Sequence, residues 1–139
     1  MNGPSKELSI VIPAYGECAQ LPDLLRSLLA EEVAREAEIL VIDDGSPRPV
    51  EPSLREILAA FKDAQCVRKP NGGGPSARNF GADRAKGRRL LFIDQDLQLP
   101  RDFVATLVKV AEEFGPAAVS ALYENRLEST SPFAEWYGI

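Results

Sequence analysis

Short apolar runs alternate along this chain with longer segments in which apolar residues recur every three or four positions. The short runs lie at residues 8–12, 38–42 and 90–93, and polar or turn residues bound each of them. This pattern predicts buried β-strands. Two weaker runs, at residues 65–68 and 117–122, predict further short strands.

The longer segments predict amphipathic helices between these strands. The first covers residues 21–36, where leucines follow the i, i+3, i+4, i+7 and i+8 spacing of one helical face. The others cover residues 52–64, 76–87 and 100–114. Because strands alternate with helices, we expect a mostly parallel sheet with helices on both faces, a three-layer, Rossmann-like α/β/α arrangement.

Proline and glycine mark the expected ends of these elements. Pro13 is expected to end the first strand because proline lacks the N–H that a sheet needs, and the glycine-rich residues 70–75 form a turn that can adopt positive φ. We expect one domain over residues 1–139. The aromatic residues at 131–139 fit either a terminal helix docked on this domain or a fold that is incomplete at its C-terminus, and we expect the second.

The composition excludes several functional classes. A net charge of −5 without a long basic cluster argues against nucleic acid as a partner, and the absence of histidine excludes serine–histidine, cysteine–histidine and imidazole–metal chemistry. Cys18 and Cys66 lack the spacing of a zinc or redox motif and predict reduced thiols in a cytoplasmic protein. The sequence contains neither an apolar run of about 20 residues nor a signal-peptide pattern, so no membrane span is expected. Peripheral attachment at the inner face of a membrane stays open.

A D-x-D motif, formed by Asp94, Gln95 and Asp96, follows the apolar run at 90–93. If the strand geometry persists, Asp94 and Asp96 project to the same face at the carboxyl end of a strand, where ligands bind in open α/β sheets. Two carboxylates this close favour a cation between them, and a hard divalent ion with oxygen ligands also binds phosphates. The alternative is a solvated turn in which the aspartates cap the next helix.

Other side chains are expected at the same edge of the sheet, because they follow strands or begin the helices after them. The expected set is Tyr15, Asp43, Asp44, Arg78, Asp94 and Asp96. An aromatic ring to stack a base, a carboxylate to accept its N–H, and an arginine and a metal to hold phosphates together suit a nucleoside diphosphate. Each member has a structural alternative: a surface ring, an aspartate that binds loop amides, or an ion pair of Arg78 with Asp83 or Asp94.

In these motifs the chain resembles the family-2 glycosyltransferases, inverting enzymes of the GT-A fold. Order and spacing agree to about Leu122. The matching motifs are SIVIPAY at 9–15, the leucines and Ser27 within 21–29, EILVIDDGS at 38–46, NGGGPSARNFG at 71–81, and Gly87 with LFIDQD at 91–96. The chain departs from the family pattern at Gly16, where asparagine is frequent, and at residues 47–49, which replace the usual threonine or aspartate.

This resemblance implies a UDP- or GDP-sugar donor, Mn²⁺ or Mg²⁺ as cofactor, and transfer of the sugar to the hydroxyl of an unknown acceptor with inversion. It implies that Pro13, Ala14 and Tyr15 line the nucleoside pocket, that Asp44 binds the base and Arg78 lies by the nucleotide, that Asp94 faces the ribose or sugar, and that Asp96 reaches the metal. The full candidate binding set is Pro13, Ala14, Tyr15, Glu17, Asp43, Asp44, Gly74, Arg78, Asp94 and Gln95, with Asp94 and Asp96 as metal ligands.

The resemblance leaves the catalytic residue unknown. In the family the general base is a carboxylate far downstream, in the half that binds the acceptor, and Glu124, Glu128 and Glu135 do not lie in that motif. We therefore expect the base to be absent from this chain, and either an acceptor-binding region or a homo-oligomer to complete the protein.

Two other functions stay open at this point. Residues 72–77 fit the G-x-G-x-x-A pattern of a dinucleotide-binding domain, and Asp94 lies about 20 residues further on, although Pro75 removes an amide where a pyrophosphate needs one. The chain could also be a truncated, non-catalytic domain that binds a nucleotide sugar or a partner protein.

Overall fold

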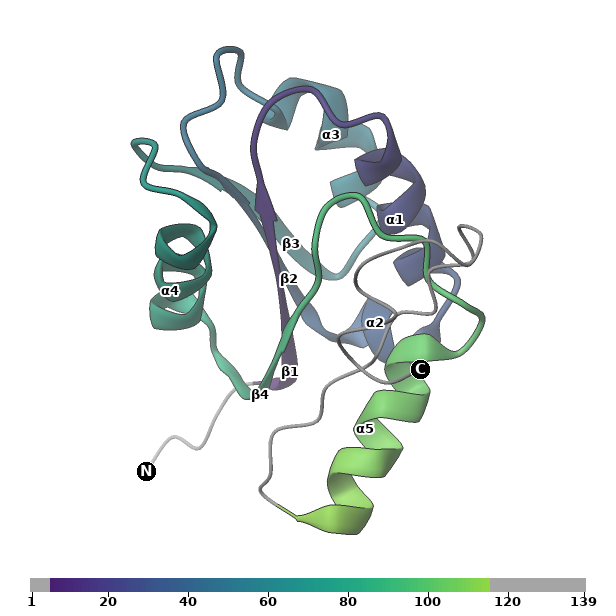
Figure 1. Ribbon diagram of the computed structural model, residues 1–139. Helices are drawn as coiled ribbons and strands as arrows, with labels where there is room; N and C mark the ends of the chain where they lie inside the picture. The colour runs from purple at the N-terminus through teal and green to yellow at the C-terminus, as the bar shows by residue number, and fades with distance from the viewer. Residues whose placement is uncertain (1–5, 116–139) are drawn as a thin grey trace, which may run out of the picture.

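The computed structural model describes residues 6–115, and its centre is a four-stranded, fully parallel sheet with the strand order β3-β2-β1-β4 (Figure 1). The strands are β1 (Lys6–Ala14), β2 (Glu38–Asp43), β3 (Asp63–Arg68) and β4 (Gly87–Phe92). The helices are α1 (Gln20–Leu29), α2 (Glu32–Glu36), α3 (Glu51–Leu58), α4 (Gly74–Arg84) and α5 (Phe103–Phe114). The predicted α/β fold is confirmed within this range. The strand predicted at 117–122 and the aromatic residues at 131–139 lie outside the described residues.

Helices cover both faces of the sheet, as Figure 1 shows. On one face, α1, α2, α3 and α5 pack against Ile10, Ile12 and Ile39. On the other face, α4 packs against Val11 and Ile42. The two central strands are therefore buried on both faces, which explains why they read as almost continuous apolar runs. No helix within residues 6–115 is long and apolar enough to cross a membrane.

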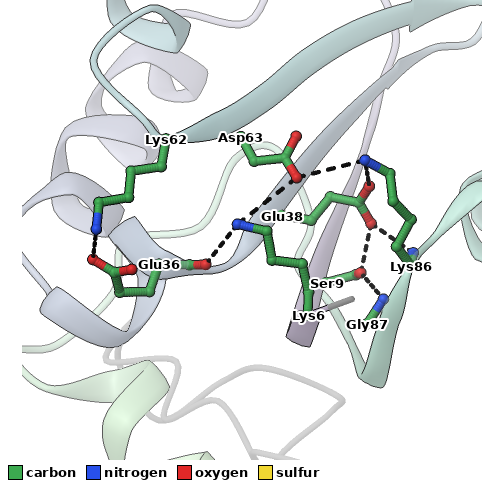
Figure 2. Close-up of polar contacts among 8 residues, drawn as sticks. All are labelled: Lys6, Ser9, Glu36, Glu38, Lys62, Asp63, Lys86 and Gly87. Carbon is green, nitrogen blue, oxygen red and sulfur yellow. Dashed lines mark hydrogen bonds and ion pairs between the residues drawn. The ribbon is translucent and has the colours of Figure 1, made fainter. Parts of the chain in front are cut away.

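A buried polar network joins the amino-terminal ends of three strands (Figure 2). The carboxylate of Glu38 is fully buried, and its Oε1 accepts hydrogen bonds from Ser9 Oγ (2.6 Å) and the Lys86 N–H (2.8 Å). Ser9 Oγ in turn accepts the Gly87 N–H (2.8 Å). A Cβ at Gly87 would lie 2.4 Å from the Ser9 nitrogen, so only glycine fits there. Around this network, surface ion pairs join Lys6 and Lys86 to Asp63, and Lys62 to Glu36.

The helix predicted over residues 21–36 is in fact two helices, because the chain becomes extended at Glu31 (φ −101°, ψ 126°). The Glu31 side chain is buried, and its carboxylate accepts hydrogen bonds from the N–H groups of Val104 (3.1 Å) and Ala105 (3.0 Å) at the start of α5. A contact between residues more than seventy positions apart therefore breaks a helix that the leucine spacing alone would continue.

The prediction that Pro13 ends the first strand is wrong, since β1 continues to Ala14. Val11 accepts a hydrogen bond from Ile93 on the β4 side, and Ala14 accepts one from Asp44 on the β2 side. Because these directions alternate along a strand, the missing N–H of Pro13 faces the β4 side. Pairing with β4 ends at Val11, whereas pairing with β2 continues through Pro13 to Ala14, so the missing N–H does not end the strand.

The strand predicted as buried at 90–93 is β4, an edge strand that is buried on one face only. Leu91 and Ile93 pack into the core that also contains residues of α1 and α5. Leu90 and Phe92 are 42% and 41% exposed, because α4 covers β1 and β2 rather than the edge of the sheet. The expectation of a buried strand is therefore corrected, since only one of its two faces is buried.

Candidate functional site

A pocket of about 260 Å³ opens at the carboxyl edge of the sheet, where the ends of β1, β2 and β4 meet the start of α4. The pocket is lined by Pro13, Ala14, Tyr15, Asp44, Gly74, Ala77, Arg78, Asp94, Gln95 and Asp96. All but two of the residues predicted for the site are in this lining. The fold thus brings together residues from distant parts of the sequence, such as Tyr15 and Gln95, which are 80 positions apart.

The loop after β1 is fixed by its backbone while the ring of Tyr15 stays free. The Tyr15 N–H donates to Gln95 Oε1 (3.2 Å), and Gln95 Nε2 donates to the Tyr15 carbonyl (3.1 Å). The next amide, that of Gly16, donates to Ser46 Oγ (2.9 Å). Tyr15 is 52% exposed, so its aromatic surface is available for a ligand. Gln95 therefore holds two loops together in addition to lining the pocket.

The carboxylate of Asp44 is turned inward and anchors the glycine-rich loop before α4. Its Oδ1 accepts hydrogen bonds from Lys69 Nζ (2.7 Å) and the Gly72 N–H (3.0 Å). Its Oδ2 accepts the Gly73 N–H (2.8 Å) and a longer bond from Asn71 Nδ2 (3.3 Å). Burial alone would raise the pKa of Asp44, but the hydrogen bonds from Lys69 and the two loop amides hold this pKa below its ordinary value.

Asp43, which was a candidate for nucleotide binding, is not in the pocket lining. Adjacent side chains of a strand project to opposite faces, and Asp43 is buried on the other side, beside the loop after β2. Its carboxylate accepts the N–H groups of Ser46 (3.0 Å) and Val50 (3.2 Å) and pairs with Arg68 (3.0 Å). Burial opposes ionisation, but these hydrogen bonds and the charge of Arg68 lower the pKa of Asp43. This arrangement matches the alternative of an aspartate that binds loop amides.

Glu17 is the other candidate that lies outside the pocket lining. Its side chain is exposed and is 3.9 Å from Arg48. The position of a side chain in the middle of a loop does not follow from strand or helix periodicity, so the sequence offered no means of excluding it.

Ala77 lines the pocket, although the sequence analysis did not single it out. It lies three residues after Gly74 and just before Arg78 in α4, so the i, i+3, i+4 spacing of a helical face was the available signal. Its small side chain is fully buried and lets α4 approach the sheet.

Arg78 and Asp94 form an ion pair across the pocket, with 2.8 Å between Arg78 Nη2 and Asp94 Oδ1. Both side chains are partly exposed, and such pairs contribute roughly 0–1 kcal/mol to stability, so a stronger ligand can replace either partner. Asp96 is also exposed at this edge of the pocket.

The donor set at the pocket fits a divalent ion that is shared with a ligand. In the described part of the chain, no three acidic, cysteine or histidine side chains gather closely enough to hold a metal ion. Mg²⁺ typically uses one or two carboxylates together with water and substrate phosphates. Asp94 and Asp96 can supply the carboxylates, and water and phosphates would supply the remaining oxygen ligands.

The dinucleotide-binding alternative conflicts with this geometry. In that motif, amides of the glycine-rich turn bind a pyrophosphate at the start of the helix. Here the amides of Gly72 and Gly73 donate to the Asp44 carboxylate, and Pro75 has no amide to donate. The amides of this loop therefore already bind a carboxylate of the same chain, that of Asp44.

Residues 9–134 match the family described as glycosyl transferase family 2. This match covers most of the sequence and all the segments that line the pocket. The chain therefore belongs to glycosyl transferase family 2, as its motifs suggested.

Solved glycosyltransferase structures share the fold. The mannosyltransferase PcManGT from Pyrobaculum calidifontis, in complex with GDP-Man and Mn²⁺, aligns with a TM-score of 0.72 and 23% identity over 90% of this chain. S. aureus TarS 1–349 in complex with UDP-GlcNAc gives 0.69 and 19% over 88%. S. aureus TarS gives 0.67 and 24% over 77%. The matches cover 38%, 38% and 20% of those three chains, so this chain spans well under half of their length.

Proposed function

We propose that this chain is the donor-binding part of an inverting glycosyltransferase, and that its pocket holds a UDP- or GDP-sugar together with Mn²⁺ or Mg²⁺. The observation that carries this proposal is the convergence of Tyr15, Arg78, Asp94 and Asp96 on one pocket in a family-2 fold. Membership of the family and the ligands in the related structures support it.

The nucleoside end of the ligand would lie between the loop after β1 and the start of α4. The exposed ring of Tyr15 offers a stacking surface, and its backbone is held by Gln95. Asp44 lies in the same lining and carries a negative charge at neutral pH, so it suits a base that presents an N–H donor. Uracil and guanine both have such a donor.

The diphosphate end would lie near Arg78 and the D-x-D motif. The guanidinium of Arg78 can exchange its exposed partner, Asp94, for a phosphate, because charged bidentate contacts to phosphate are strong. Asp94 and Asp96 would then hold the metal. When bound, the ion would neutralise negative charge on the diphosphate as it leaves the sugar.

Transfer to an acceptor also needs a general base that takes a proton from the attacking hydroxyl. We assign this role to no residue of the pocket, since Asp44 holds the glycine-rich loop and Asp94 and Asp96 would hold the metal. The residues of this site bind and orient the donor, and the acceptor and the general base belong to the part of the reaction that this pocket does not supply.

The proposal is tested by measuring the melting temperature of the chain with UDP, GDP and NAD, each with and without Mn²⁺. A ligand that binds the folded state raises the melting temperature by mass action. We expect UDP or GDP to raise it only with the metal. Asp96→Asn should remove the effect, whereas Asp83→Asn, which changes an exposed acid on α4 outside the pocket, should retain it.

Two results would contradict the proposal. Stabilisation by NAD without metal would favour a dinucleotide site. No response to any nucleotide would favour a non-catalytic domain that serves a protein partner.

A further inference from the structure

We propose that Lys69 is a positioning residue of the nucleotide site, and that it acts through Asp44 to hold the glycine-rich loop of residues 70–74 in its binding conformation. This inference rests on the proposed function of the pocket. It concerns a residue that is not in the pocket lining, so it is separate from the contacts expected for the ligand.

Lys69 is unusually placed for a lysine. Its side chain is only 9% exposed, although lysine is almost never buried unless it is paired. Its ammonium donates to Asp44 Oδ1 (2.7 Å) and to the carbonyl of Pro70 (2.7 Å). One end of the loop is therefore tied, through a single charged group, to the end of β2.

The partner of Lys69 has no hydrogen-bonding capacity to spare. A carboxylate offers about four acceptor positions, and Asp44 receives four donors: Lys69, Asn71 and the amides of Gly72 and Gly73. The bond from Lys69 differs from the other three because both of its partners are charged, whereas the other donors are neutral. Without the Lys69 ammonium, all the remaining donors to the buried Asp44 carboxylate would belong to the glycine-rich loop. No group outside the loop would then fix the position of this carboxylate.

The loop conformation depends on this anchor. Gly73 adopts φ +94°, which is open to glycine but strained for other residues, and its carbonyl accepts the first helical amide bond, from Ala77 (3.0 Å). A Cβ at Gly72 would lie 3.0 Å from Lys69 Nζ, so the lysine packs directly against the loop backbone. Gly74 and Arg78, which line the pocket, lie in the helix that begins directly after Gly73.

It follows that Lys69 lowers the cost of nucleotide binding by ordering the loop beforehand. A loop that must be ordered by the ligand reduces its affinity, because part of the binding free energy is spent on that ordering. A base that donates to Asp44 would displace the weakest donor, Asn71 at 3.3 Å, while Lys69 and the two amides stay in place.

The test compares Lys69→Met with Lys69→Arg, which keeps the charge. Lys86→Met is the matched control, because it removes a lysine paired with another buried carboxylate, that of Glu38, at the opposite end of the sheet (Figure 2). Hydrogen exchange of the Gly72 and Gly73 amides is measured without ligand, and the Kd of UDP and GDP is measured with Mn²⁺. Lys69→Gln serves as a second variant if Lys69→Met does not fold.

We expect Lys69→Met to speed exchange of both amides and to weaken nucleotide binding by about tenfold or more, the size of one lost charge-assisted hydrogen bond. Lys69→Arg should recover most of both effects, and Lys86→Met should change neither. Weaker binding with unchanged amide exchange would overturn the proposal in favour of direct contact with the ligand. Unchanged binding and exchange would overturn it outright.

The two hypotheses fail in different ways. If the wild-type chain binds no nucleotide, the proposed function fails, and the exchange of the two amides alone still shows whether Lys69 orders the loop. If the wild type binds but the Lys69 variants match it, only the role of Lys69 is lost.

Discussion

Asp43 and Asp44 are neighbours in sequence, yet their carboxylates hold two different loops. Asp43 accepts amides of the loop between β2 and α3, whereas Asp44 accepts amides of the loop between β3 and α4. Alternation at the end of the strand separates them, so one aspartate supports the fold while the other reaches the pocket. The two adjacent aspartates therefore have different roles, because their side chains point in different directions.

Asp43 should make stability depend on pH in acid. Its folded-state pKa lies below the ordinary value of 3.8, so its contribution is complete above that pH and is lost as the pH falls through the folded-state pKa. Asp43→Asn should lower the free energy of unfolding at neutral pH by about 1–3 kcal/mol, since buried donors lose their charged acceptor. Urea denaturation at about pH 7 and about pH 3 checks this, and the wild type should lose more stability on acidification than the variant. An equal loss in both proteins would contradict the assignment.

Arg78 should matter for binding and little for folding. Its pair with Asp94 is partly exposed, so Arg78→Met should change the free energy of unfolding by less than about 1 kcal/mol. The affinity for UDP or GDP with Mn²⁺ should fall by about tenfold or more, because a charged contact to phosphate is removed. Arg55→Met, which breaks an exposed pair with Glu51 on α3, is the control. It should leave the nucleotide affinity measured by titration calorimetry unchanged. Equal affinities for the two variants would remove Arg78 from the site.

At the scale of the elements, α5 is fixed by an acid from outside the helix. Glu31→Gln should lower the free energy of unfolding by about 1–3 kcal/mol, because the amides of Val104 and Ala105 lose a buried carboxylate. The neighbouring Glu32 side chain is exposed, so Glu32→Gln should have little effect on the free energy of unfolding. Denaturant unfolding of both variants tests this, and equal stabilities would show that Glu31 does not hold α5.

The elements also show how far the sequence could predict the fold. The strands at 8–12 and 38–42 were found because burial on both faces leaves a plain apolar run. The break at Glu31 could not be predicted, because it depends on the distant amides of Val104 and Ala105. The exposed face of β4 could not be predicted either, because it depends on α4 covering β1 and β2 instead of this strand. Pro13 was misjudged because the direction of its missing N–H depends on the neighbouring strands.

The candidate site could be predicted to a similar extent. Residues that end strands, such as Asp94 and Asp96, were placed at one edge by topology alone. The inward turn of Asp44, the anchoring role of Gln95 and the place of Asp43 depend on side-chain contacts that no local pattern reports.

At the scale of the whole molecule, the two ends of the sheet serve different purposes. The amino-terminal end is closed by the buried network of Ser9, Glu38 and Gly87, and the carboxyl end opens into the pocket. Ser9→Ala should therefore lower the free energy of unfolding by about 1–3 kcal/mol without changing nucleotide affinity. Chemical denaturation and calorimetry on the same sample test the separation, and a parallel loss of affinity would contradict it.

The central claim, that the pocket binds a nucleoside diphosphate through a shared divalent ion, is tested most directly by following the backbone amide resonances of the isotope-labelled chain during titration with Mn²⁺. We predict that, with UDP or GDP present, paramagnetic broadening centres on Asp94 and Asp96 and extends to Gly74 and Arg78. Without nucleotide the broadening should be weak. Broadening that centres elsewhere, or that is the same with and without nucleotide, would contradict the account.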